Sequence, residues 1–218
     1  MASPHIAYVA DDIIHRMGER SWIVGNDVLD VNLLLSAKEH NKQIILLSAT
    51  RFRDKNYRKD LRSKLEPQLT ENVRLRTAAL LNENFILYLE ELFLNTPDIT
   101  RKAIVLSVPD FWYGFKLEAV PEGFFYGGMP SDTLGDSRLG KTNEALWNAF
   151  AKKIVTEKRG TEGRLGKIYH DALKRQVSML VNNEGVRLDN AGDTASALRL
   201  YALSRRYNPD KVSALLNQ

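Results

Sequence analysis

Short runs of branched apolar residues alternate with amphipathic segments through the first half of the chain, and this alternation restricts the fold more than any other feature. The apolar runs are bounded by turn-forming residues and predict strands at Trp22 to Gly25, Ile44 to Ala49, Val73 to Ala79 and Ala103 to Val108. The intervening segments have helical periodicity, at about residues 27 to 40, 55 to 65 and 83 to 95. Strands that alternate with helices need crossover connections, so we expect a mixed α/β fold whose N-terminal βαβ-type layer has mainly parallel strands.

The sequence pattern changes after residue 108. Residues 109 to 141 are rich in proline and glycine, which predicts a long surface connection or a small antiparallel ribbon. Helical patterns follow at about residues 143 to 158, 164 to 182, 193 to 206 and 210 to 217. We therefore divide the chain into an α/β domain at residues 1 to 120, an irregular connection at 121 to 142 and a helical part at 143 to 218. The helical part can pack on the first domain as one unit.

The residues that usually hold metals or cross-link chains are scarce. The 218 residues include no cysteine, which excludes disulfides and cysteine-ligated zinc, and the four histidines show no paired ligand spacing. We expect no metal site and no cofactor. Asp11 and Asp12 interrupt the segment in which a signal peptide would be apolar, and no apolar run reaches the 18 or so residues that cross a bilayer. We expect a cytoplasmic or nuclear protein that is not secreted and has no membrane partner.

Positive charge is concentrated in two segments. Residues 51 to 64 hold seven basic and two acidic residues, and residues 152 to 175 hold eight basic and three acidic ones, although the whole chain has a net charge of only +4. On helices these basic residues share a face, opposite apolar residues that include Leu61 and Leu173. Such faces suit nucleic-acid backbones, because each neutralised phosphate releases counterions. The candidate nucleic-acid-binding residues are Arg51, Arg53, Lys55, Arg58, Lys59, Arg62, Lys152, Lys153, Arg164, Lys167, Lys174 and Arg175.

The main functional hypothesis is therefore non-catalytic binding of a phosphate-rich partner, with nucleic acid, RNA or DNA, as the expected one. No RNP, KH or zinc-finger motif is present, so we expect contacts to the backbone and not recognition of a base sequence. Two other interpretations stay open. The charges can simply solvate the surface, and the C-terminal helices can support self-association in a structural or assembly protein.

One short string supports an alternative function. The sequence GDSRLGKT, Gly135 to Thr142, fits the Gly-x4-Gly-Lys-Thr pattern of a P-loop and resembles the phosphate loop of small GTPases. The resemblance implies ATP or GTP with Mg²⁺, bound by Gly135, Gly140, Lys141 and Thr142. The residues before the string form turns and predict no strand, and no Asn-Lys-x-Asp base-recognition element follows. The other interpretation is a glycine-rich loop in which Thr142 caps the next helix.

Three aspartates follow predicted strands. Asp27, Asp54 and Asp110 would meet at the carboxyl edge of a parallel sheet, where α/β folds place their sites, and together could hold Mg²⁺ for phosphodiester chemistry. Helix capping explains two of them without any chemistry. With Asp27 as the N-cap, Asp30 falls in the first helical turn, and Asp54 is a candidate cap for the following helix.

Overall fold

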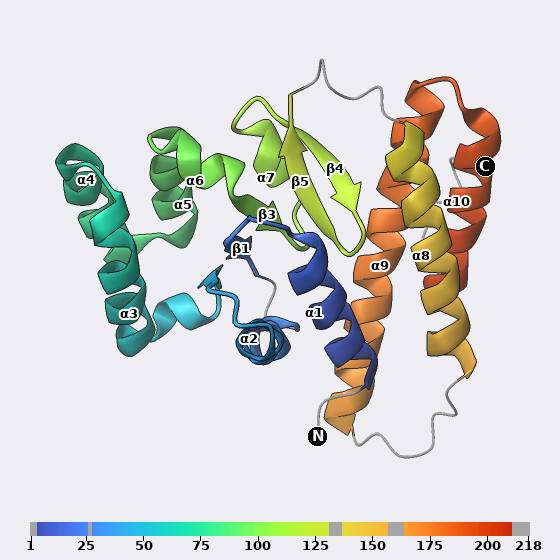
Figure 1. Cartoon of the computed structure of the whole chain (residues 1–218), viewed down its shortest axis with the longest axis horizontal. Helices are drawn as coiled ribbons and strands as arrows, with labels where there is room; N and C mark the ends of the chain where they lie inside the picture. The colour runs from blue at the N-terminus through green and yellow to red at the C-terminus, as the bar shows by residue number, and fades with distance from the viewer. Residues whose placement is uncertain (1–3, 26–27, 131–136, 157–163, 211–218) are drawn as a thin grey trace.

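The fold is described from a computed structural model that covers residues 4–25, 28–130, 137–156 and 164–210. Its centre is a five-stranded sheet with strand order β2-β1-β3-β5-β4 (Figure 1). Three strands are parallel: β1 (Trp22–Val24), β2 (Ile45–Leu47) and β3 (Ala103–Val105). The strands β4 (Glu118–Glu122) and β5 (Phe125–Met129) form an antiparallel hairpin that joins the sheet through β3.

The parallel strands confirm the mixed α/β fold with a mainly parallel N-terminal layer. Helix α2 (Asp30–Glu39) carries the chain from β1 to β2, as a crossover between neighbouring parallel strands must. Gly25 follows β1 and has no room for a side chain, because a Cβ atom there would lie 2.5 Å from Asp30 Oδ1. The antiparallel ribbon predicted within residues 109 to 141 is the β4–β5 hairpin, so the sheet continues beyond residue 120.

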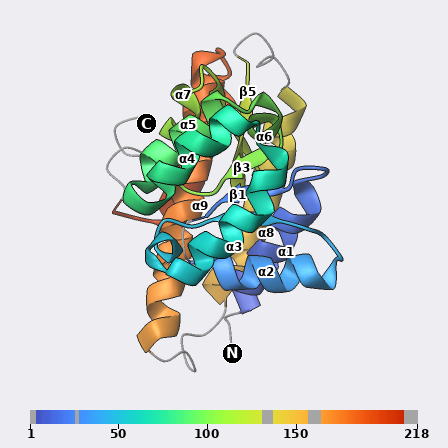
Figure 2. The same cartoon turned by 90° about the vertical axis from the view of Figure 1, so that its left-hand side faces the viewer.

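A layer of short helices connects β2 to β3. It consists of η1 (Arg51–Arg53), α3 (Lys55–Leu65), η2 (Glu66–Gln68), α4 (Glu71–Glu83), α5 (Phe85–Leu94) and α6 (Pro97–Arg101). Seen from the left-hand side of Figure 1, these helices lie in front of the strands (Figure 2). The strand predicted at Val73 to Ala79 is wrong, because this segment belongs to α4. Its buried residues Val73, Thr77 and Leu81 are spaced by four, which is a helical repeat.

The other side of the sheet is covered by α1 (Pro4–Arg16) and the C-terminal helices α8 (Ser137–Thr156), α9 (Arg164–Asn190) and α10 (Thr194–Tyr207) (Figure 1). Helix α8 holds the turn of the hairpin. Asn143 accepts a hydrogen bond from Gly123 N (2.8 Å) and donates one to Pro121 O (2.7 Å), while Trp147 Nε1 donates to Gly123 O (2.8 Å). The helical part and the sheet therefore share one buried core.

Helix α9 connects the core to the carboxyl edge of the sheet, since Gln176 Nε2 donates to Leu106 O just after β3 (2.9 Å). It packs against α10 at close range. The hydroxyls of Ser178 and Ser204 lie 2.9 Å apart and are buried, and Gly185 lies against the ring of Tyr201. Within the described part of the chain no helix is both long and apolar enough to cross a bilayer.

Candidate functional site

The first basic segment forms η1 and α3, and its orientation is fixed by buried residues on the opposite face of α3. Tyr57, Leu61 and Leu65 are buried, as their spacing predicts. The Tyr57 hydroxyl donates to Leu46 O (2.6 Å) and accepts from Ser48 N (2.9 Å), which ties α3 to the end of β2. Burial raises the pKa of this hydroxyl to about 12. The basic side of α3 consequently points outward.

Several cations of this segment already interact within the protein. The Arg51 guanidinium lies 4.9 Å from the centre of the Tyr57 ring, and Arg58 donates to the Phe52 carbonyl oxygen (2.7 Å). The pairs Arg62–Glu66 (2.6 Å) and Lys64–Asp60 (2.9 Å) span successive turns of the chain. By contrast, Arg53, Lys55 and Lys59 are exposed, and their side chains form no hydrogen bond or ion pair with another residue in the described ranges.

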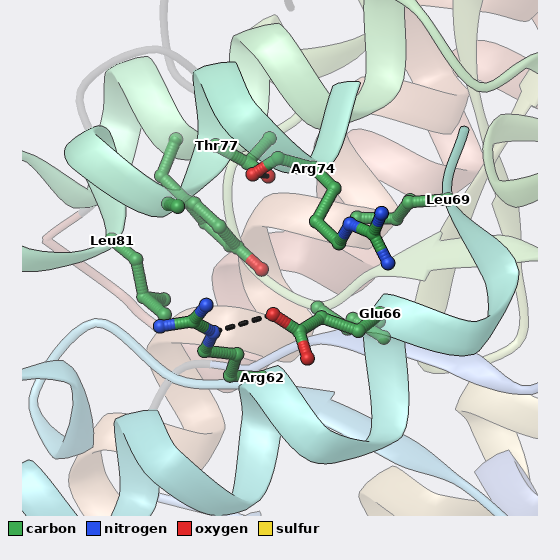
Figure 3. A pocket seen from close by; sticks show the side chains of 9 residues that line it. Arg62, Glu66, Leu69, Arg74, Thr77 and Leu81 are labelled. Carbon is green, nitrogen blue, oxygen red and sulfur yellow. Dashed lines mark hydrogen bonds and ion pairs between the residues drawn. The ribbon is translucent and has the colours of Figure 1, made fainter. Parts of the chain in front are cut away.

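A small pocket lies behind this face, between α3, η2, α4 and α5. Figure 3 shows the Arg62–Glu66 ion pair on one side of it, with Arg74 and Thr77 from α4 on the other. Its cavity volume is about 10 Å³. This is roughly the space of one water molecule, so the pocket is no ligand site.

The second basic segment lies on α8 and α9, away from α3 (Figure 1). Lys152 and Lys153 are exposed near the end of α8, and Lys153 Nζ lies 4.0 Å from the centre of the Tyr8 ring. On α9, Lys167 and Arg175 are exposed, Lys174 is half-buried, and Arg164 is the first helical residue.

The apolar side expected for this part of α9 is confirmed only in part. Leu173 and Leu180 are buried, but Ile168 is 52% exposed. The first turns of α9 extend below α1 and α8 at the lower end of Figure 1. The reverse side of this second basic segment is otherwise packed, since Phe150 and Ile154 of α8 are buried together with Leu173 of α9.

Of the three aspartates, the two described ones, Asp54 and Asp110, lie at the start of different helices. Asp54 caps α3 by accepting from Asn56 N (2.8 Å), so capping accounts for it. Asp110 begins the short helix α7 (Asp110–Tyr113), and Asp27 lies outside the described residues. Helix α2 begins at Asp30 and its N-cap residue is Leu29, so the interpretation with Asp27 as the N-cap and Asp30 three positions after it is wrong. In the described part of the chain no group of three or more histidine, aspartate or glutamate side chains could hold a metal ion.

The P-loop-like string falls at the start of α8. Gly135 lies outside the described residues, whereas Gly140, Lys141 and Thr142 are inside the helix, which begins at Ser137. Thr142 is therefore not the N-cap that one interpretation of the string predicted. In a P-loop the glycine-rich turn precedes the helix and surrounds the phosphates with free N–H groups. Beyond the first helical turn these N–H groups are used within the helix.

A cleft of about 540 Å³ opens between α7, β4 and the C-terminal half of α9. Its lining combines carboxylates, amides and one cation; the residues are Pro109, Asp110, Tyr113, Glu118, Ala119, Asn183, Val186, Arg187, Asn190 and Ala191. Arg187 is held by two 2.8 Å hydrogen bonds to Glu184, a side chain with no exposed surface. The Glu184 carboxylate raises the pKa of Arg187. Sequence reasoning missed this cleft, because its walls come from residues 109 to 119 and 183 to 191 and no short motif links them.

Comparisons with known proteins add no assignment: no family model, curated protein or solved structure matches the chain.

Proposed function

We propose that the protein binds a phosphate-rich partner, nucleic acid, through the outward face of η1 and α3. The observation that carries this proposal is the exposure of Arg53, Lys55 and Lys59 on an element whose opposite face is buried. Three exposed cations without internal partners in the described ranges can each neutralise a phosphate, and two of them, Lys55 and Lys59, lie one turn apart on α3. No base-reading motif accompanies them, so the contacts we propose are with the backbone.

Charge reversal on α3 tests nucleic-acid binding best at residues whose side chains form no hydrogen bond or ion pair with the other residues that the structure describes. Arg58 and Arg62 are engaged with the Phe52 carbonyl and with Glu66, so reversing their charge would also disturb the fold. Lys55 and Lys59 lie one turn apart on α3 and can be reversed without breaking a hydrogen bond or ion pair in the described part of the chain. The test is the double variant Lys55→Glu with Lys59→Glu. Its matched control is Lys102→Glu with Arg206→Glu, at exposed positions on other elements.

Each reversal changes the charge by two, so both double variants have a formal net charge of zero instead of +4. Fluorescence anisotropy with a labelled single-stranded oligonucleotide, repeated over a range of salt concentrations, gives the affinity and its salt slope. We expect the α3 variant to lower both, with the slope falling by about 0.7 for each phosphate that is no longer neutralised. The control should keep the wild-type slope. Equal behaviour of the two variants, or no binding by the wild-type protein at low salt, would refute the proposal.

A further inference from the structure

We propose that the cleft between α7, β4 and α9 is a second binding site, and that its ligand carries an alkylammonium or guanidinium group. The cleft volume of about 540 Å³ falls within the range of roughly 300 to 1,000 Å³ found for small-molecule sites. It is open to solvent, since Asp110 and Asn190 on its walls are exposed. None of its described lining residues belongs to the basic face of α3 or to the P-loop-like string.

The sign of the charge in the cleft points to a cation. Asp110 and Glu118 supply two carboxylates, and Arg187 is the single base among the lining residues that the structure describes. Both oxygens of the buried Glu184 bind Arg187, so an internal carboxylate offsets its charge. Helix α9 ends at Asn190 in the cleft wall, and the C-terminal end of a helix carries a partial negative charge. Counted over the described lining residues alone, acidic groups therefore outnumber basic ones, whereas the whole chain has a positive net charge.

The neutral groups in the lining suit the same ligand. Tyr113 is 55% exposed, and its ring at the cleft offers a face for cation–π contact. Partial burial raises the pKa of the Tyr113 hydroxyl, and the nearby carboxylates of Glu118 and Asp110 raise it further, in this order of size. Asn183 donates its amide nitrogen to the Tyr126 hydroxyl (3.0 Å). Asn183 is also a lining residue of the cleft, so an amide side chain stands beside the two carboxylates.

Two probes with alkylammonium groups test whether the ligand is a free polyamine or a basic peptide. Spermidine represents a free polyamine, and N-acetyl-Lys-Lys-amide represents the basic side chains of a peptide. N-acetyl-Glu-Glu-amide is the anionic control. Isothermal titration calorimetry of the full chain should show saturable binding of at least one cationic probe and none of the acidic dipeptide. The tighter of the two cationic probes identifies the source.

The variant Asp110→Asn with Glu118→Gln removes both charges with little change in shape. We expect the affinity for the cationic probe to fall by at least about tenfold. The matched control is Glu83→Gln with Glu90→Gln, which changes the net charge equally at exposed positions on α4 and α5. It should bind as the wild type does. At Tyr113, Tyr113→Phe should keep most of the affinity, whereas Tyr113→Leu should lose it because the aromatic face is gone.

The proposal is overturned if neither cationic probe binds with saturation up to about 1 mM, a very weak affinity on the usual scale. It is equally overturned if cleft and control variants bind alike, or if the acidic dipeptide binds as tightly as the basic one. Thermal unfolding of each variant shows whether the fold is intact. Because α3 is not part of the cleft, the cleft variants should bind the oligonucleotide like the wild type, so the two proposals can fail separately.

Discussion

Replacing Gly185 by alanine should change the free energy of unfolding through two opposing effects: a higher helix propensity, which stabilises, and overpacking of the core, which destabilises. Gly185 lies near the C-terminal end of α9, facing α10, and a Cβ atom there would be 2.6 Å from Tyr201 Cε1 and 2.8 Å from Cδ1. Non-bonded carbon atoms settle at about 3.5 to 4.0 Å. Tyr201 is only 2% exposed, so its ring cannot swing into solvent. The two helices must separate by roughly 1 Å or the ring must leave its preferred position.

The helix propensity of alanine would stabilise α9 by about 1 kcal/mol relative to glycine. Overpacking a filled core costs about 1 to 3 kcal/mol. The new methyl group would meet a ring edge held by both helices, which places Gly185→Ala at the upper end of that cost. We expect the free energy of unfolding to fall by about 1 to 2 kcal/mol net. In a chain of 218 residues this corresponds to a melting temperature lower by roughly 2 to 8 °C.

Urea unfolding followed by far-ultraviolet circular dichroism measures this change, with Gly114→Ala as the matched control. Gly114 has φ −59°, and a Cβ atom there would meet only Phe111 O, at 3.5 Å. Since this is an ordinary contact in an allowed conformation, the control should change stability by less than about 0.5 kcal/mol or raise it slightly. If Gly185→Ala is as stable as the wild type, the close packing of α9 on α10 is wrong.

Buried polar groups give three further predictions. Tyr57→Phe leaves the buried Ser48 N–H without its acceptor, so the free energy of unfolding should fall by about 1 to 3 kcal/mol in urea titrations, with an unchanged slope. Because Tyr57 has a pKa of about 12 when folded and about 10 when unfolded, its contribution to stability should be constant below about pH 10 and decrease towards pH 12; absorbance at 295 nm should show tyrosine ionisation together with unfolding. Glu184→Ala leaves Arg187, whose side chain is 15% exposed, without its carboxylate and should cost about 3 to 5 kcal/mol; a Glu184→Met, Arg187→Met double variant should lose less.

The sequence correctly predicted the elements in which the spacing of apolar residues alone defines the buried side. The parallel strands and the outward basic face of α3 are of this kind, because branched runs and the spacing of Tyr57, Leu61 and Leu65 each define a buried side. The segment Val73 to Ala79 was predicted wrongly, since a short apolar run fits a strand and a helix equally well. In α1 the buried residues Ile6, Val9 and Ile13 repeat at helical spacing, so this helix is also predictable from the sequence.

The cleft could not have been predicted in the same way. Glu118 and Arg187 face one space only because α9 crosses the sheet next to β4, and this packing depends on contacts far apart in the sequence. The hydrogen bond from Gln176 to Leu106 O, across 70 positions of the chain, is one such contact. Counting charges along the sequence identifies the two basic segments but not the acidic cleft. The two carboxylates of the cleft, Asp110 and Glu118, are eight positions apart in the sequence and belong to different elements.

The two proposed surfaces have opposite charge and lie on different elements. Their ligands also have opposite charge and bind each other, so the affinity for each ligand must be measured in the absence of the other. A polyamine binds oligonucleotides directly, because it replaces the counterions on the phosphates. Adding spermidine to a protein–oligonucleotide mixture would therefore weaken the complex at the α3 face even if the cleft bound nothing. Titrated alone, spermidine reports on the cleft, where exchanging Asp110 and Glu118 for their amides removes the attraction and leaves Lys55 and Lys59 unchanged. If the cleft variant lost polyamine affinity and kept the oligonucleotide salt slope of the wild type, the two charged sites would be independent, as their positions on different elements imply, the cleft on α7, β4 and α9 and the basic face on α3.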